Sequence, residues 1–98
     1  MVRQIVLMRW TADASDEAKR VVAEALLGLK DKIDGIRDVR LGSDLRIRED
    51  NFDFAVSVDF DDKAGYMHYR NHPAHIRVVE DMIRPVMAER VGVVFDCR

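Results

Sequence analysis

Residues 52–60, Phe-Asp-Phe-Ala-Val-Ser-Val-Asp-Phe, show a strict two-residue alternation of large apolar side chains with small or acidic ones. Successive side chains of a strand point to opposite faces, so the large residues share one face. The members of that face are Phe52, Phe54, Val56, Val58 and Phe60. A face this apolar predicts a strand in a sheet that is covered by helices on one side.

The stretch before this strand predicts a long helix. Residues 18–33 repeat apolar side chains at the three-and-four spacing of one helix face, which comprises Ala18, Val21, Val22, Ala25, Leu26, Leu29 and Ile33. Asp13 or Ser15 can accept a backbone N–H as the N-cap, and the acidic residues that follow suit the positive end of a helix. Gly35 can adopt the left-handed conformation that ends many helices.

The rest of the chain predicts three further strands and a second, interrupted helical region. We expect strands over residues 2–10, 36–47 and 91–96. Helical patterns run from residue 61 to about 69 and from 74 to 83, and they are separated because the residue before Pro73 avoids the helical region. The order β-α-β-β-α-β favours an α+β fold with an antiparallel sheet and helices on one face. The other face needs a partner, so we expect a homodimer formed sheet to sheet.

The length and composition of the chain exclude several classes of protein. A chain of 98 residues is long enough for one domain, residues 1–98, with a core modest enough to favour oligomerisation. Its 48% apolar residues exclude a disordered chain, and its net charge of −2 argues against nucleic-acid binding. The single cysteine, Cys97, excludes a disulfide framework and a cysteine-rich zinc site. No long apolar run or signal-peptide pattern is present, so we expect a cytoplasmic protein that does not enter a membrane.

The stretch 69–75, Tyr-Arg-Asn-His-Pro-Ala-His, carries a resemblance to a known family. Together with residues 4–7, 36–39, 60–62 and 94–96, it resembles the stress-responsive A/B barrel (Dabb) domains across nearly the whole chain. Members of that family have a ferredoxin-like fold and pair two sheets into a barrel. The resemblance therefore implies a ferredoxin-like antiparallel sheet with helices on one face, assembled as a dimeric α/β barrel.

Within the family, polyketide cyclases of the olivetolic acid cyclase type resemble this chain across the same stretch. In those enzymes the tyrosine and the second histidine of the motif carry the acid/base chemistry, which implies catalytic roles for Tyr69 and His75. A further active-site histidine lies in their first strand, where this chain has Gln4. The family also includes stress-associated proteins without established catalysis.

The chemistry of ring closure suits the residues of this motif. An aldol-type closure needs a base beside a carbonyl and a donor for the resulting oxyanion. His75 titrates near neutrality and can serve as the base, while the Tyr69 hydroxyl can donate a proton. A break at Pro73 can turn both side chains toward one cavity between helices and sheet. Gln4 and His72 are the candidate substrate-binding residues, and Gln4 can orient a carbonyl without acting as a base. The hypothesis is a cofactor-free cyclase or isomerase for a small, largely apolar, oxygenated ligand.

Three alternatives stay open. Tyr69 and His75 can be semi-buried groups that hydrogen-bond only within the chain, in a non-catalytic, stress-associated structural dimer. His72 and His75 form a His-x-x-His pair that can ligate a metal, but the sequence supports no third ligand, so we predict no metal and no cofactor. A set of arginines can hold an acidic ligand, although a solvated, salt-bridged face is more common for such a pattern, and its members are Arg37, Arg40, Arg46 and Arg48.

Overall fold

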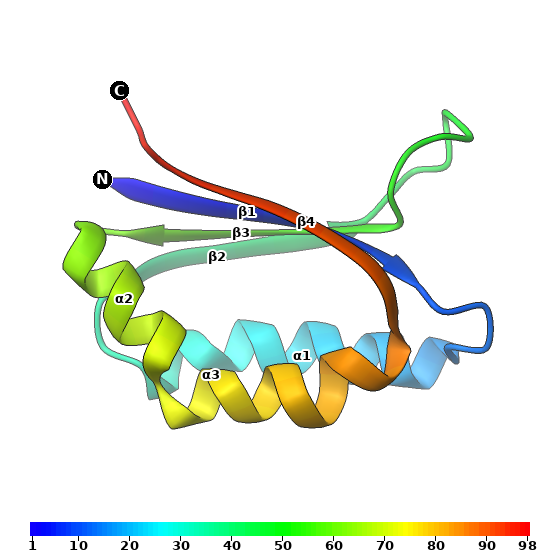
Figure 1. The fold of residues 1–98 in the computed structure, drawn as a ribbon, viewed down its shortest axis with the longest axis horizontal. Coiled ribbons are helices and arrows are strands. Elements are labelled where there is room, and N and C mark those ends of the chain that lie inside the picture. The colour runs from blue at the N-terminus through cyan, green and yellow to red at the C-terminus, as the bar shows by residue number, and fades with distance from the viewer.

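The computed structural model describes residues 1–98 and contains one four-stranded sheet with helices against one face (Figure 1). The strands are β1 Val2–Trp10, β2 Ile36–Ser43, β3 Phe54–Phe60 and β4 Met87–Asp96. The helices are α1 Asp16–Lys32, α2 Lys63–Asn71 and α3 Pro73–Val78. After α3 the chain continues through a π-helical turn, η1 Val79–Ile83, and a 3-10 turn, η2 Arg84–Val86.

The topology confirms the predicted fold class. The element order is β-α-β-β-α-β, the strand order is β2-β3-β1-β4, and every strand pair is antiparallel. In β1, one of the two inner strands, Val6 lies opposite Val56 of β3 and Gly92 of β4. α1 and α3 lie side by side beneath the sheet (Figure 1). No helix in the structure combines the length and the apolar character needed to cross a membrane.

Helix α1 begins and ends as its sequence predicts. The Ser15 hydroxyl accepts a hydrogen bond of 3.1 Å from the backbone N–H of Ala18, so Ser15 rather than Asp13 is the N-cap. Gly35 follows the helix with a φ of +96°, in the left-handed region that a side chain would strain. These two residues set the length of the helix and return the chain to the sheet.

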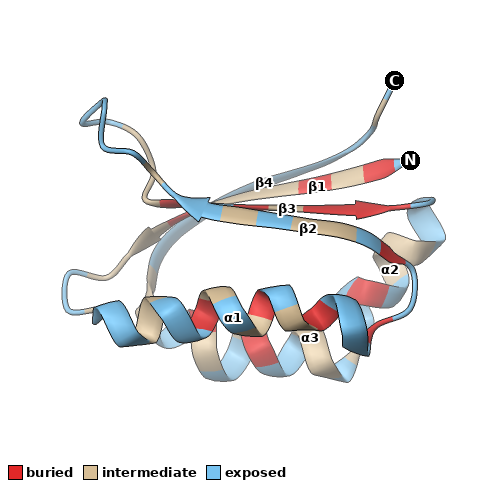
Figure 2. Cartoon of the chain, turned by 180° about the vertical axis from the view of Figure 1, so that it is seen from behind, coloured by how far each residue is buried: buried red, intermediate tan, exposed pale blue.

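The core lies between the sheet and the helical layer. In Figure 2 the buried residues of α1 form a stripe that faces the sheet, while the outer side of the helix is exposed. Phe60 has no exposed surface, and its ring packs against the rings of Tyr66 and Tyr69 at centroid distances of 5.7 and 5.1 Å. The other fully buried side chains are those of Met8, Leu29, Ile33, Val22 and Val58.

The predicted second and third strands are both too long at the end that faces the turn between them. β2 ends at Ser43 instead of residue 47, and β3 begins at Phe54 instead of residue 52. The carboxylate of Asp44 accepts hydrogen bonds from the Arg46 backbone and from the Asn51 amide, so this segment bonds within itself instead of extending the ladder. Leu45 and Ile47, which fit the alternating pattern, are consequently 82% and 81% exposed.

The end of the second helical region also departs from the prediction. The predicted helix over residues 74–83 is α-helical only to Val78 and then widens into the π turn. Thr11 donates its backbone N–H to the carbonyl of Val86, and Met87 pairs with Trp10 immediately afterwards. These contacts start β4 four positions before the predicted residue 91.

The loop of residues 44–53 projects from the sheet on the side opposite the helices (Figures 1 and 2). Arg9 holds it to β1, because its guanidinium donates to the carbonyls of Asp50 and Asn51. The same guanidinium lies 4.1 Å from the centroid of the Phe52 ring. The sheet therefore has one face covered by helices and one open face with a raised rim.

Candidate functional site

A cavity of about 250 Å³ lies between the sheet and the helical layer. Its walls are largely apolar and include Val6, Met8, Leu26, Val56, Val79 and Ile83. Its polar groups include Gln4, Tyr69, Arg70, His75 and Arg90, and no acidic residue lines it. Small-molecule sites combine apolar walls with a few placed polar groups in this way. The π turn η1 contributes to the wall, and such turns occur frequently at functional sites.

Tyr69 brings a protonated hydroxyl into this cavity. It lies near the end of α2 and is only 3% exposed. Its hydroxyl makes no hydrogen bond within the chain. The only side-chain polar atom that is both fully enclosed and without a partner is Thr11 Oγ1, so the Tyr69 hydroxyl is not fully enclosed. The Tyr69 hydroxyl therefore remains accessible from the cavity. Burial raises the pKa of this phenol above its ordinary value of 10.0, so the group keeps its proton at neutral pH.

His75 lies beside Tyr69 with one nitrogen free. The two ring centroids are 4.2 Å apart. His75 Nδ1 lies 3.3 Å from the backbone carbonyl of Arg70. A carbonyl only accepts hydrogen bonds, so in the neutral imidazole the hydrogen belongs on Nδ1 and the lone pair on Nε2. Burial lowers the pKa of His75 below its ordinary 6.5, with the hydrogen bond to Arg70 opposing and the charge of Arg90 assisting.

The break between α2 and α3 brings these two side chains together. Tyr69 precedes the break and His75 follows it, with Pro73 at the first position of α3. His72 ends α2 with extended backbone geometry, which redirects the chain by the time α3 begins. Two side chains that could not be neighbours on one straight helix therefore meet at one end of the cavity.

Gln4 reaches the same cavity from the sheet. It lies on β1 between Val58 of β3 and Val94 of β4, and it is 8% exposed. Its side-chain amide makes no hydrogen bond within the chain and is not fully enclosed. The amide can thus donate to or accept from a ligand, although it cannot take up a proton at neutral pH.

His72 lies elsewhere and has a different role in the structure. Its Nδ1 accepts a hydrogen bond of 3.0 Å from the backbone N–H of Ala74, so the ring caps α3. It packs edge-on against His68 at a centroid distance of 5.5 Å and does not line the cavity. The structure thus separates His72 from Gln4, Tyr69 and His75, and it contains no group of three or more potential metal ligands.

Arg70 and Arg90 are lining residues that the sequence reasoning did not identify. Arg90 precedes the predicted start of the last strand, but it lies within β4 and opposite Met8 of β1. Residues paired across antiparallel strands share a face, so Arg90 lies on the helix side of the sheet with buried Met8. Extending the predicted strand over residues 91–96 by one residue toward the N-terminus would have included Arg90.

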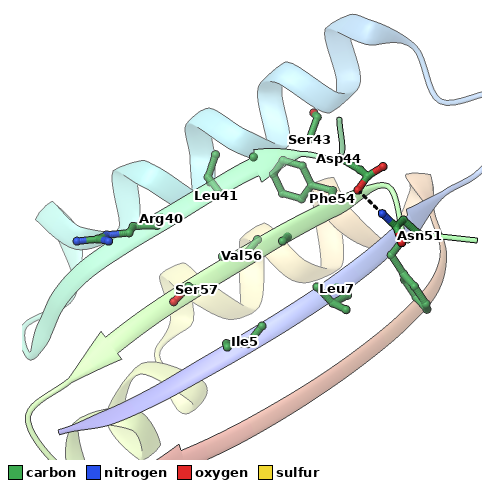
Figure 3. Close-up of a pocket in the computed structure, with 13 residues that line it drawn as sticks. Ile5, Leu7, Arg40, Leu41, Ser43, Asp44, Asn51, Phe54, Val56 and Ser57 are labelled. Atoms are coloured by element: carbon green, nitrogen blue, oxygen red, sulfur yellow. Dashed lines mark hydrogen bonds between the residues drawn. The ribbon is translucent and has the colours of Figure 1, made fainter. Parts of the chain in front are cut away.

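A second hollow, of about 480 Å³, lies on the open face of the sheet (Figure 3). Ile5 and Leu7 of β1 and Ser57 of β3 form part of its floor, and the loop of residues 44–53 forms its rim. In Figure 3 the Asn51 amide points to the Asp44 carboxylate, to which it donates at 3.1 Å. This hollow is larger but more open, and it contains neither a histidine nor a tyrosine.

The arginine set flagged in the sequence forms ion pairs with neighbouring carboxylates. Arg40 pairs with Asp38 at 2.8 Å, and Arg37 pairs with Asp61 at 3.1 Å. The other two members pair with acidic residues of the loop between β2 and β3, Arg46 with Asp44 and Asp53, and Arg48 with Asp50. A salt-bridged surface describes these residues better than an anion site does.

Comparisons with known proteins agree with this architecture. A "dimeric ferredoxin-like protein of unknown function" from Thermobifida fusca is 33% identical, with a TM-score of 0.89 over 98% of this chain and 90% of that one. A dimeric protein of unknown function from Bacteroides fragilis is 26% identical, with a TM-score of 0.81 over 98% of this chain and 95% of that one. The hydroxynitrile lyase of Passiflora edulis is 19% identical, with a TM-score of 0.90 over 99% of this chain and 93% of that one.

No curated protein matches the chain by sequence. The sequence model of one family, described as the "Stress responsive A/B Barrel Domain", matches residues 2–97. That match spans every strand and helix of the fold described above. The chain therefore belongs to the stress-responsive A/B barrel (Dabb) family.

Proposed function

We propose that this protein binds a small, largely apolar, oxygenated molecule in the helix–sheet cavity and catalyses a cofactor-free proton transfer on it. One observation carries the proposal. Gln4, Tyr69 and His75 bring hydrogen-bonding atoms without partners in the chain into one apolar cavity. Buried polar groups in folded proteins are usually satisfied, so unused capacity gathered at one place favours a ligand site.

The proposed step is an enolisation. His75 Nε2 removes a proton from a carbon beside the ligand's carbonyl, and the electron pair of that C–H bond moves onto the carbonyl oxygen. The Tyr69 hydroxyl donates a hydrogen bond to that oxygen and stabilises its negative charge. Return of the proton to another carbon gives isomerisation, and attack of the enolate carbon on a second carbonyl gives cyclisation.

Both pKa shifts support these roles. Because the pKa of His75 is lowered by burial, the imidazole is neutral and able to accept a proton at pH 7. Because the pKa of Tyr69 is raised, its hydroxyl is a donor over the same range. An acid and a base that keep opposite roles at one pH are typical of acid/base sites.

Gln4 limits which residues can act as the base in the proposed reaction. The polyketide cyclases that this chain resembles have a histidine in the first strand, and glutamine cannot take up its proton. We therefore assign base chemistry to His75 alone and give Gln4 an orienting role. The fold relationship to a hydroxynitrile lyase makes a hydroxynitrile a useful additional probe beside keto compounds.

We further propose that two copies associate through the open sheet face. The neighbours from T. fusca and B. fragilis are described as dimeric. Val91, Val93 and Phe95 of β4 leave 40–53% of their surface exposed on that face, beside Ile5 and Leu7 of β1. A monomer gains from covering such an apolar strip. A second copy would also cover the hollow shown in Figure 3.

Hydrogen–deuterium exchange tests the enolisation without knowledge of the natural substrate. Aryl and alkyl β-keto esters and ketones are incubated in D₂O, and loss of the proton beside the carbonyl is followed by NMR. We expect faster exchange with the protein than without it for at least one panel member. The variant His75→Gln should lose about 100-fold or more of that rate, and Tyr69→Phe should lose about tenfold or more.

The matched control is His68→Gln, because His68 is exposed and lies outside the cavity. This variant should exchange protons at the wild-type rate. If no panel member exchanged faster with folded protein than without it, the result would contradict the enolisation. If His75→Gln then lowered only thermal stability, the result would favour a non-catalytic, stress-associated dimer.

A further inference from the structure

The helix–sheet cavity carries positive charge that the proposed acid/base pair does not use. Arg70 and Arg90 both line it, and none of its 13 lining residues is acidic. Neither guanidinium pairs with a carboxylate of the chain, whereas most other arginines do, for example Arg3 with Asp59 at 2.7 Å. A cavity with unpaired guanidinium groups and no acidic group favours an anionic ligand.

Of Arg70 and Arg90, Arg90 is better placed to bind an anionic group of a ligand in the cavity. It lies opposite Met8 on the helix side of the sheet, so its side chain starts beside the cavity. Its guanidinium lies along β4 over Gly92, where a Cβ would stand only 3.3 Å from both terminal nitrogens. The missing side chain at Gly92 thus leaves space for the guanidinium. Its charge also reaches both Tyr69 and His75: it partly opposes the rise in the pKa of Tyr69 that burial causes, and it adds to the lowering of the pKa of His75 by burial.

We infer that Arg90 selects ligands that carry a carboxylate, an inference that rests on the proposed function of the cavity. Guanidinium and carboxylate groups match in planar, bidentate geometry, and charge-assisted hydrogen bonds are stronger than neutral ones. The apolar walls would hold the hydrocarbon part of the molecule. A carboxylate at Arg90 would fix the position of the ligand's carbonyl relative to Tyr69 and His75, which makes Arg90 a specificity-determining residue.

A matched pair of ligands tests this inference. β-Benzoylpropionate and its methyl ester share an aromatic ring and a ketone and differ in charge. Isothermal titration calorimetry should give the acid about tenfold higher affinity than the ester for the wild-type protein. The variant Arg90→Gln should remove this difference chiefly by weakening the acid. Arg77→Gln is the control, because Arg77 is exposed on α3, forms no ion pair and does not line the cavity.

The possible outcomes distinguish a failure of the role of Arg90 from a failure of the proposed ligand site. Equal affinities of acid and ester for wild type, or a preference that survives in Arg90→Gln, would overturn the role of Arg90 and leave the cavity as a ligand site. A preference lost equally in Arg77→Gln would also overturn it, because the effect would then reflect overall charge. Absence of binding by both compounds would overturn it together with the ligand site itself.

Discussion

At the scale of single residues, the hydrogen bond between His75 Nδ1 and the Arg70 carbonyl is the contact on which the chemistry depends. It fixes the tautomer that leaves Nε2 free to take a proton. The resemblance to the polyketide cyclases predicted that Tyr69 and His75 act together, and the break expected at Pro73 allowed both side chains to turn toward one cavity. The tautomer and the missing partners of Gln4 and Tyr69 depend on three-dimensional contacts, and no sequence pattern encodes them.

The pKa of His75 gives the first prediction. Because burial lowers it in the folded state, His75 should titrate with a midpoint below 6.5, and the acid limb of any catalysed exchange should lie below that pH as well. Stability from the neutral imidazole is present above pH 6.5 and is lost as the pH falls through the folded-state value. NMR titration of the His75 ring protons measures the midpoint. A midpoint at or above 6.5 would contradict the burial of this side chain.

The ion pair between Arg3 and Asp59 gives a second prediction of pH dependence. The guanidinium donates to both carboxylate oxygens, at 2.7 and 3.0 Å, and lowers the pKa of Asp59 below 3.8. This contribution is present above pH 3.8 and is lost as the pH falls through the folded-state value. Denaturant unfolding should find Asp59→Asn less stable than wild type near neutrality, with the gap closing in acid. A gap independent of pH would assign the loss to packing instead.

At the scale of elements, the turn from α2 to α3 places both candidate catalytic side chains, and His72 stabilises that turn. The sequence motif made His72 a candidate for substrate binding, but its Nδ1 accepts a hydrogen bond from the backbone N–H of Ala74. The ends of the strands were predictable from the alternation of side chains only where no other hydrogen bonds or strand pairing overrode it. β1 matches its prediction, whereas the bonds of Asp44 and the early pairing of Met87 shift the ends of β2 and β4.

The cap predicts how His72 variants behave. His72→Ala should lower the free energy of unfolding by about 1 kcal/mol through loss of the cap, while ligand affinity of the folded protein is retained. His72→Asn should restore most of that stability, because asparagine is a good N-cap. Urea unfolding of the three proteins provides the measurement. Unchanged stability combined with lost ligand affinity would assign His72 to the site after all.

At the scale of the whole molecule, one face of the sheet builds the core and the cavity, and the other face remains open. The alternation of β3 predicted this division, because its two faces differ so clearly in size and polarity. The number of copies that associate through the open face depends on the whole surface of that face, which the sequence pattern of a single strand does not determine. The exposed strip on β4 makes the assembly testable.

A charge in the middle of that strip should separate the proposed dimer. Val93 is 53% exposed and lies on the open face, so Val93→Glu would bury a carboxylate without a partner in the interface. Sedimentation should show wild type as a dimer and this variant as a folded monomer. Leu27→Glu is the control, because Leu27 is 47% exposed on the outer side of α1 and should leave the dimer intact. A Val93→Glu protein that remains dimeric would place the interface elsewhere.

The central claim is that the helix–sheet cavity is the ligand site, and a two-dimensional NMR titration of the labelled protein tests it most directly. Titration with aryl and alkyl keto compounds should give saturable shifts at Gln4, Tyr69 and His75, with little change at Ile5 and Leu7 on the open face. Shifts confined to the open face, or no shifts from a folded sample with any compound of the panel, would contradict the claim.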